Sequence, residues 1–152
     1  LTDNLAQAIK AGCGTEQLGK YLVRLNNVLF AQGTDFAAIA YGEVAQKILA
    51  KQATPNVIPS LVNVQSYIAM SYDRQAYKAL KEKNLELYKD LTAKSKENYS
   101  KAISLAQKAP AGTIGSAWSQ TIQSGLQRSE QRMKEYERAY RVAKENIEAS
   151  VN

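Results

Sequence analysis

Residues Ile114 to Ala149 read IGSAWSQTIQSGLQRSEQRMKEYERAYRVAKENIEA, and this stretch decides the fold. Small and apolar side chains recur in it at alternating four- and three-residue steps, a spacing that puts them along one side of a helix. We call this set the heptad stripe, and its members are Ile122, Leu126, Ser129, Met133, Tyr136, Tyr140, Ala143 and Ile147. Such a helix is about 50 Å long. Because its stripe is apolar, it requires a neighbour of similar length.

Residues 74–108 provide a neighbour of nearly the same length, and they join the first helix through a short loop. The loop, Ala109 to Thr113, contains Pro110 and Gly112, which end one helix and prepare the next. An antiparallel hairpin of residues 74–108 and 116–149 is therefore the predicted centre of the fold.

The predicted fold class is all-α, an elongated helical bundle of four or five helices in a single domain over residues 1–152. Its parts are two shorter helices within residues 1–53 (15–33 and 36–53, preceded by a short helix at 3–11), a proline linker at 54–60, and the long hairpin helices 61–108 and 116–149. Acidic residues precede basic ones by four positions in six places, which supports helices. These pairs are Glu16/Lys20, Glu43/Lys47, Asp90/Lys94, Glu97/Lys101, Glu130/Lys134 and Glu137/Arg141.

The two shorter helices each have a one-sided apolar pattern. In the first, the pattern consists of Leu18, Leu22, Leu25 and Leu29; in the second, it consists of Phe36, Ala40, Val44 and Ile48. Both sets are expected to face the core. The linker at 54–60 is expected to be extended, because Pro55 and Pro59 each disfavour helix in the preceding residue.

Segment 61–108 contains no glycine or proline, so it is predicted to be one helix of about 75 Å. That exceeds its partner, and we expect either a kink near residues 71–73 or an end covered by the first two helices. Its best apolar positions are Tyr77, Leu80, Leu87 and Leu91. Residues 92–98 offer none, so packing is predicted to be poorest there, opposite residues 127–133.

Catalytic chemistry has little support in this composition. The chain has no histidine and one cysteine, Cys13, which excludes Ser-His-Asp and Cys-His nucleophiles and histidine-rich zinc sites. The acidic residues Glu82, Glu86 and Asp90 share a predicted helix face, but lysines bracket them, as on a solvated surface. We therefore expect a non-enzymatic protein without a metal or cofactor.

Basic charge is concentrated in one part of the chain. The net charge is +6, and residues 74–108 hold nine Lys or Arg against four acids. The candidate basic face is Lys78, Lys81, Lys89, Lys94 and Lys101. Such a face is either a solvated helix surface or a site for an anionic polymer such as nucleic acid.

Tyrosine is unusually frequent, with nine in a chain that has two Phe and one Trp. The candidate interaction surface is Tyr77, Tyr88, Leu91, Tyr99, Met133, Tyr136 and Tyr140. A half-polar surface of this kind suits a protein partner, a second copy of the chain or a small ligand.

The leading hypothesis from the sequence is a protein–protein interaction or assembly module of an exported or surface apparatus. A ligand-sensing extracytoplasmic bundle of a receptor is the alternative, and binding of an anionic polymer is the third. The start at Leu1, the Lys-, Asn-, Gln- and Ser-rich polar residues and the lack of an enzyme motif favour an extracytoplasmic location, whether periplasmic, secreted or at the surface. No apolar run in the chain is long enough to cross a membrane.

Overall fold

The computed structural model describes residues 7, 10, 15–52 and 54–152, and this part of the chain is helical with no strand. Its elements are α2 (Thr15–Ala31), α3 (Asp35–Ala50), the short 3-10 helix η1 (Pro55–Val57), α4 (Ile58–Lys81), α5 (Leu85–Lys108) and α6 (Ser116–Val151). The predicted all-α bundle is confirmed. The expected short helix at residues 3–11 lies almost wholly outside the described residues.

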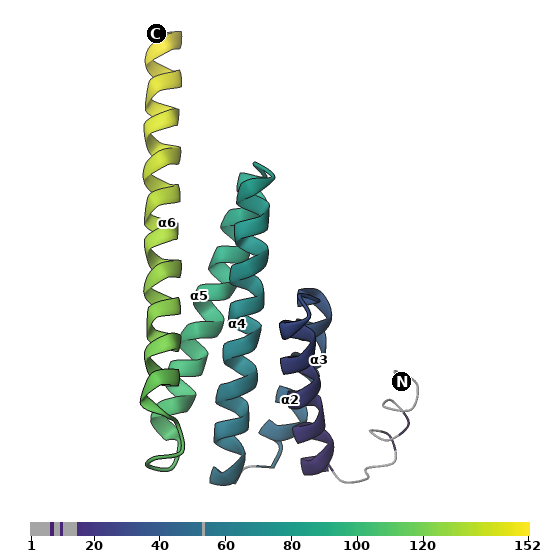
Figure 1. The fold of residues 1–152 in the computed structure, drawn as a ribbon. Coiled ribbons are helices and arrows are strands. Elements are labelled where there is room, and N and C mark those ends of the chain that lie inside the picture. The colour runs from purple at the N-terminus through teal and green to yellow at the C-terminus, as the bar shows by residue number, and fades with distance from the viewer. Residues whose placement is uncertain (1–6, 8–9, 11–14, 53) are drawn as a thin grey trace.

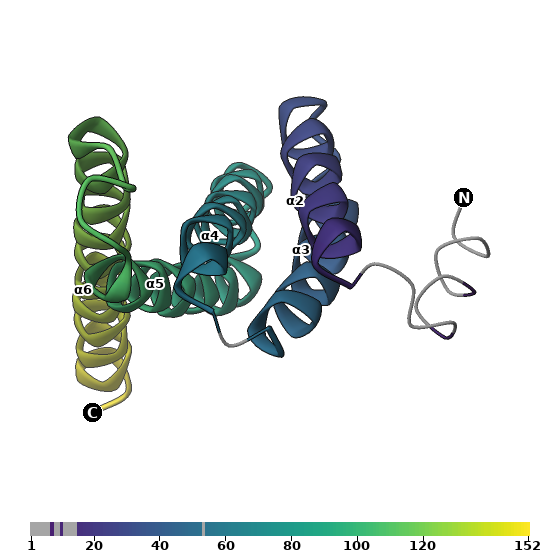
Figure 2. The same cartoon turned by 90° about the horizontal axis from the view of Figure 1, so that it is seen from below.

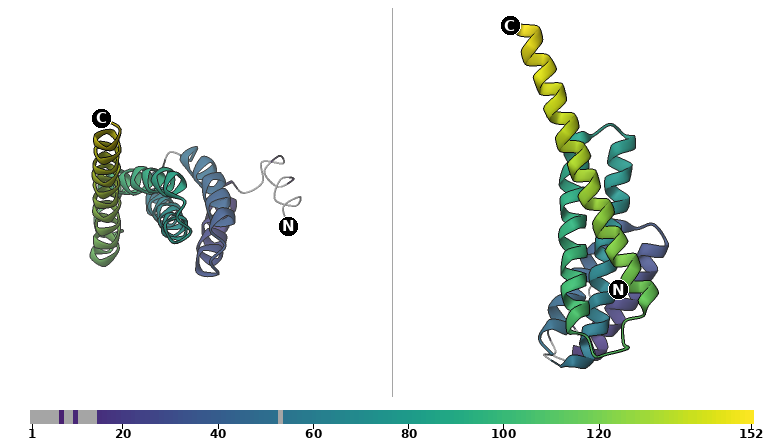
Figure 3. Two further views of the ribbon diagram at one scale, coloured as in Figure 1. Left: turned by 90° about the horizontal axis from the view of Figure 1, so that it is seen from above. Right: turned by 90° about the vertical axis from the view of Figure 1, so that its left-hand side faces the viewer.

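The helices are arranged in a row in which each packs on the next (Figures 1 and 2). At one side is α6, which packs on α5; α5 packs on α4, and α4 packs on the pair formed by α2 and α3. The closest association is between α4 and α5, not between α5 and α6 as the sequence predicted. Beyond the turn that joins α4 and α5, α6 continues alone (Figures 1 and 3).

Three apolar clusters hold this row together. The first lies among α2, α3 and α4 and includes Leu22, Leu49 and Ile68. The second joins α4, α5 and α6 through residues such as Tyr99 and Ile122. The third lies beside the turn between α4 and α5 and consists of Ala76, Ala79, Tyr88 and Leu91, with Tyr72 and Tyr136 packed against it.

The predicted single helix over residues 61–108 is wrong, because the chain reverses direction at residues 82–84. Lys83 has φ 59°, in the left-handed region that ends helices, although it is not a glycine. The side chain of Asn84 then accepts a hydrogen bond from the backbone N–H of Leu87 at 3.2 Å and caps α5. The helix does not break at residues 71–73, which lie within α4.

The expected extended linker at 54–60 is also corrected. Residues Pro55–Val57 form η1, and α4 already begins at Ile58, with Pro59 in its first turn. Proline fits this position because the first N–H groups of a helix have no partner within the helix. The expected helix start at residue 61 is therefore three residues too late.

Packing is close where residues 92–98 were expected to pack poorly. Thr92, Ser95 and Ser129 are buried, and the Ser95 hydroxyl donates a hydrogen bond to the Ala69 carbonyl oxygen at 3.0 Å. The Ser95 and Ser129 hydroxyl oxygens are 3.3 Å apart. Small residues allow the helices to approach each other, so the absence of large apolar side chains indicated close contact instead of a gap.

The apolar side of α3 is rotated from the predicted one. Phe36 is 68% exposed and Val44 is also exposed, whereas Ile39 and Leu49 are buried. Gly42 lies against the Asn26 and Ile68 side chains, so closely that an added Cβ would come within 3.0 Å of both. In α2 the prediction was nearer, since Leu22 is buried and Leu18, Leu25 and Leu29 are partly buried.

Candidate interaction surface

Two buried or nearly buried carboxylates fix the helices that carry the candidate surface. The first is Asp35, at the start of α3, which accepts hydrogen bonds from the Arg74 Nε at 3.0 Å and from the Gln75 Nε2 at 2.6 Å. Arg74 also donates to the Phe30 carbonyl oxygen at 2.5 Å, and its guanidinium lies 4.1 Å from the centre of the Phe30 ring. These contacts tie the end of α2 and the start of α3 to the C-terminal half of α4.

The second carboxylate is Asp73 of α4, which binds α6. The Arg128 Nη2 donates to Asp73 Oδ2 at 2.9 Å, and Arg132 donates to the other oxygen of the same carboxylate. Beside this group, Tyr99 is buried against Gly125, whose missing side chain leaves room for the phenol ring. Burial, together with the negative charge of Asp73, raises the pKa of Tyr99 to about 12. The ion pairs thus hold the N-terminal half of α6 against α4 and α5.

The structure divides the predicted interaction surface between the core and the exterior. Tyr88, Leu91 and Tyr99 are buried and so belong to the core. Two others, Met133 and Tyr136, are partly buried against the bundle. The remaining members, Tyr77 and Tyr140, are exposed. The seven residues therefore do not form one continuous surface.

The heptad stripe is covered along only part of its length. Ile122 and Ser129 are buried, and Met133 and Tyr136 are partly buried. From residue 137 onward every residue of α6 is exposed, and we call residues 137–151 the α6 overhang (Figure 3). Its apolar side chains are largely open to solvent, with exposed fractions of 62% for Tyr140, 65% for Ile147 and 81% for Val151.

An apolar groove lies where the overhang passes the turn between α4 and α5. We call it the tip groove; its volume is about 480 Å³, and it is lined by Leu80, Leu85, Tyr88, Arg132, Glu135, Tyr136, Ala139, Tyr140 and Ala143. The rings of Tyr136 and Tyr140 are nearly parallel, with their centres 6.5 Å apart. Across the groove, Leu80 and Leu85 are exposed as well. The groove and the overhang together present an apolar face that no other helix of the described part of the chain covers.

Sequence reasoning identified α6's part of this face but missed the opposite wall. The heptad stripe predicted from the sequence includes Ile147, whereas the sequence predicts no role for Leu85. Leu80 was assigned to the hairpin interface. The local signal for this wall is Asn84, an N-cap residue, followed by the acidic Glu86 in the first turn of α5, which together mark a helix start within the expected continuous helix.

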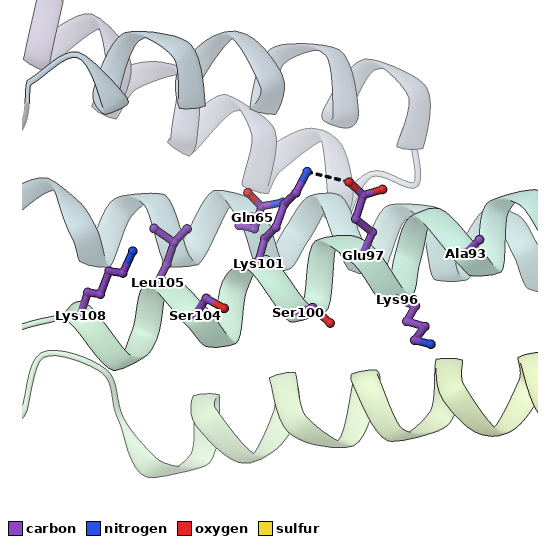
Figure 4. Close-up of a pocket in the computed structure, with 9 residues that line it drawn as sticks. All are labelled: Gln65, Ala93, Lys96, Glu97, Ser100, Lys101, Ser104, Leu105 and Lys108. Carbon is purple, nitrogen blue, oxygen red and sulfur yellow. Dashed lines mark ion pairs between the residues drawn. The ribbon is translucent and has the colours of Figure 1, made fainter.

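A second groove, with a volume of about 660 Å³, runs along the outer side of α5 (Figure 4). Its lining residues are Gln65, Ala93, Lys96, Glu97, Ser100, Lys101, Ser104, Leu105 and Lys108. Glu97 and Lys101 form an ion pair at 2.9 Å, while Lys96 points in the opposite direction from Lys101 in Figure 4. This groove is therefore a charged helix surface whose cations do not converge. Glu97/Lys101 is also, with Glu16/Lys20, one of the predicted pairs that the structure forms.

The five lysines of the predicted basic face are exposed, but they do not share one side. Lys78 and Lys81 lie in the last turns of α4, and Lys89, Lys94 and Lys101 lie on α5. The Lys89 Nζ is 5.7 Å from the centre of the Tyr136 ring on α6, whereas the Lys94 Nζ is 5.6 Å from the Tyr72 ring on α4. These two lysines thus face neighbours on different sides of α5.

The predicted carboxylate cluster does not form one helix face. Glu82 lies in the turn between α4 and α5, while Glu86 and Asp90 belong to α5. Among residues 15–52 and 54–152, no three Cys, Asp or Glu side chains are grouped in a way that would hold a metal ion. Within the same described part of the chain, no helix combines the length and apolar character that a membrane crossing requires.

Comparisons of the chain with protein-family models, with curated proteins and with solved structures found no match. The function of this chain must therefore be inferred from its fold and its exposed apolar face alone.

Proposed function

We propose that this chain is a non-enzymatic protein–protein interaction or assembly module that binds its partner on the α6 overhang and the tip groove. The observation that carries the proposal is the uncovered C-terminal part of the heptad stripe, which consists of Tyr140, Ala143 and Ile147. Its two large side chains, Tyr140 and Ile147, lie one heptad apart, and both are more than half exposed. A contiguous exposed apolar face of this kind is typical of a surface that binds another protein.

The shape of the face supports a helical partner. The overhang is about 22 Å long, and its apolar positions keep the spacing that receives side chains from a second helix. Charged residues border the stripe, as at the rim of many interfaces. The other two readings have weaker support. Lys89 and Lys94 face neighbours on different helices, and Leu80, Leu85 and Tyr140, which line the tip groove, are exposed to solvent.

A photocrosslinking experiment in cells that make the full-length protein tests this function. With p-benzoylphenylalanine in place of Tyr140, which is 62% exposed, we expect a covalent adduct with another protein chain. Ile147→Asp should abolish the adduct, since it places a charge in the interface. Ala149→Asp adds the same charge on the opposite side of α6 and should leave the adduct intact.

Monomer stability separates binding from folding in these variants. Because both substituted residues are exposed in the overhang, each should change the free energy of unfolding by less than about 0.5 kcal/mol. The proposal fails if no adduct forms, or if Ala149→Asp removes it as effectively as Ile147→Asp. A purified monomer whose thermal midpoint rises with a small aromatic ligand, and which forms no adduct, would favour the ligand-sensing alternative.

A further inference from the structure

The side of α6 that packs on the bundle continues without rotation into the overhang. Ile122 and Ser129 face α4 and α5, and Tyr136, Tyr140, Ala143 and Ile147 continue the same heptad stripe. The natural occupant of such a stripe is another helix with the same spacing. The overhang itself has this spacing, so it is complementary to a copy of itself.

We propose, resting on the function proposed above, that the partner is a second copy of this chain and that the two α6 overhangs pack antiparallel about a two-fold axis. The axis passes between Arg141 and Val142. In this register Tyr140 of each copy lies opposite Ala143 of the other, and Ile147 lies opposite Tyr136. A large residue then faces a small one at the centre, as interdigitating side chains require.

Charge complementarity selects the antiparallel register. Glu137 and Lys144 each follow a stripe residue by one position, so they border the same edge of the stripe. Antiparallel pairing brings Glu137 of each copy beside Lys144 of the other, which forms two equivalent ion pairs. The opposite edge carries Ala139 and Asn146, which are uncharged and cause no repulsion. Lys144 is free to take this partner, since its contact with Glu148 is long, at 3.9 Å, and exposed.

The tip groove of each copy receives the C-terminal end of α6 from the other copy. In the proposed register, Ile147 and Val151 of one copy reach the level of Arg132 and Tyr136 of the other, where the exposed Leu80 and Leu85 form the opposite wall. The four exposed apolar residues then cover one another. Because the axis is two-fold, this contact occurs twice, and each copy supplies both the groove and the helix end.

A parallel arrangement does not fit the bundle. The stripe that would pair is on the side of α6 that α5 already covers below Tyr136. Two parallel copies would place both bundles in the same space on that side. Each overhang projects beyond its own bundle (Figure 3), so antiparallel copies place the two bundles at opposite ends of the paired overhangs.

A charge-swap experiment tests the partner and the register together. Sedimentation velocity of the purified full chain over a concentration series should show a monomer–dimer equilibrium. Lys144→Glu replaces two attractions by two repulsions and should raise the dimer Kd roughly fivefold to tenfold. Glu137→Lys should do the same. The double variant Glu137→Lys/Lys144→Glu restores both pairs with reversed sign and should return the Kd to within about twofold of the wild type.

Cysteine crosslinking in a Cys13→Ser background tests the register independently. A mixture of Tyr140→Cys and Ala143→Cys chains should form the mixed disulfide dimer, because these positions lie opposite each other. Ala143→Cys alone should crosslink poorly. Efficient crosslinking of Ala143→Cys to itself would overturn the antiparallel register in favour of a parallel one.

The outcomes distinguish this inference from the proposed function. A chain that stays monomeric at every concentration, yet gives an Ile147-dependent crosslink to a different protein, overturns the second-copy partner and leaves the interaction module standing. A dimer that is unaffected by both the charge reversals and Ile147→Asp overturns the proposed surface itself. A dimer that Ile147→Asp disrupts, but whose charge reversals do not compensate each other, overturns only the register.

Discussion

At the scale of single residues, the fold depends on a few polar groups that the apolar pattern does not reveal. Asp35 is buried at the start of α3, and Arg74 and Gln75 satisfy it from α4. Asp73 plays the same part between α4 and α6, with Arg128 and Arg132 as donors. A buried carboxylate is costly unless it is paired, so these contacts select one relative placement of the helices.

Removing the partner of the buried carboxylate should be costly. In Arg74→Met, Asp35 loses its charged donor while it remains buried, and we expect a loss of about 2 to 3 kcal/mol in the free energy of unfolding. The loss should fall below that of a fully buried pair because the Arg74 side chain is partly exposed. Urea denaturation measures it. Lys101→Met, which breaks the exposed Glu97 pair, is the control and should cost well under 1 kcal/mol.

Tyr99 should make stability depend on pH in alkaline solution. Its native pKa is raised from 10.0 to about 12, so the fold favours the neutral phenol. The stabilisation is fully present below pH 10 and is lost as the pH rises towards 12. Urea denaturation at pH 9 and at pH 11.5 should show a larger decrease for the wild type than for Tyr99→Phe, by on the order of 1 to 2 kcal/mol. Equal decreases would contradict the burial of this phenol.

At the scale of elements, the turn between α4 and α5 determines the architecture. It converts the expected long helix into two helices that pack on each other, and it leaves α6 with a bundle shorter than itself. The tip groove exists because this turn ends beside the middle of α6. The candidate surface is thus a consequence of residues 82–84.

The left-handed residue of this turn offers a direct test. Lys83 has φ 59°, where glycine has no steric cost, so Lys83→Gly should stabilise the protein by about 0.5 to 1 kcal/mol. Glu82→Gly is the matched control, since Glu82 has φ −79° and should gain nothing. A thermal midpoint that falls in Lys83→Gly would show that residues 82–84 do not form this turn.

At the scale of the whole molecule, the helices of the row differ in how well they are supported by their neighbours. The clusters around Ile68, Tyr99 and Leu91 hold α4 and α5 from both sides. Among the residues that the structure describes, none gives the α6 overhang such support, and its helix is stabilised there by its own hydrogen bonds, the Tyr136–Tyr140 ring contact and the exposed Lys144–Glu148 ion pair. An isolated helical stretch of this length is marginal in water, so a partner would order it.

Hydrogen exchange should detect this difference. In dilute solution, amides at 138–150 should exchange close to the rate of an unstructured chain, while those at 62–76 and 88–102 should be protected to near the global free energy of unfolding. Protection of 138–150 should rise with protein concentration as the overhangs pair. Strong protection that is independent of concentration would mean that the overhang is stable without any partner.

The sequence by itself determined the helical class, the extent of α6 and the heptad stripe, because these follow from local spacing and helix geometry. It did not determine where the long helical pattern reverses, since Lys83 and Asn84 adopt the turn without glycine or proline and the α4–α5 contact stabilises it. It also did not show that Ser95, Ser129 and Gly125 are sites of close helix contact.

Tertiary structure alone decided which part of the stripe is interior. The same alternating pattern runs from Ile122 to Ile147, but the bundle ends near Tyr136. Burial depends on which residues of the other helices pack against each position of α6. The periodicity of one helix does not contain that information. The core half of α6 and its candidate interaction half are therefore alike in sequence and distinct only in the fold.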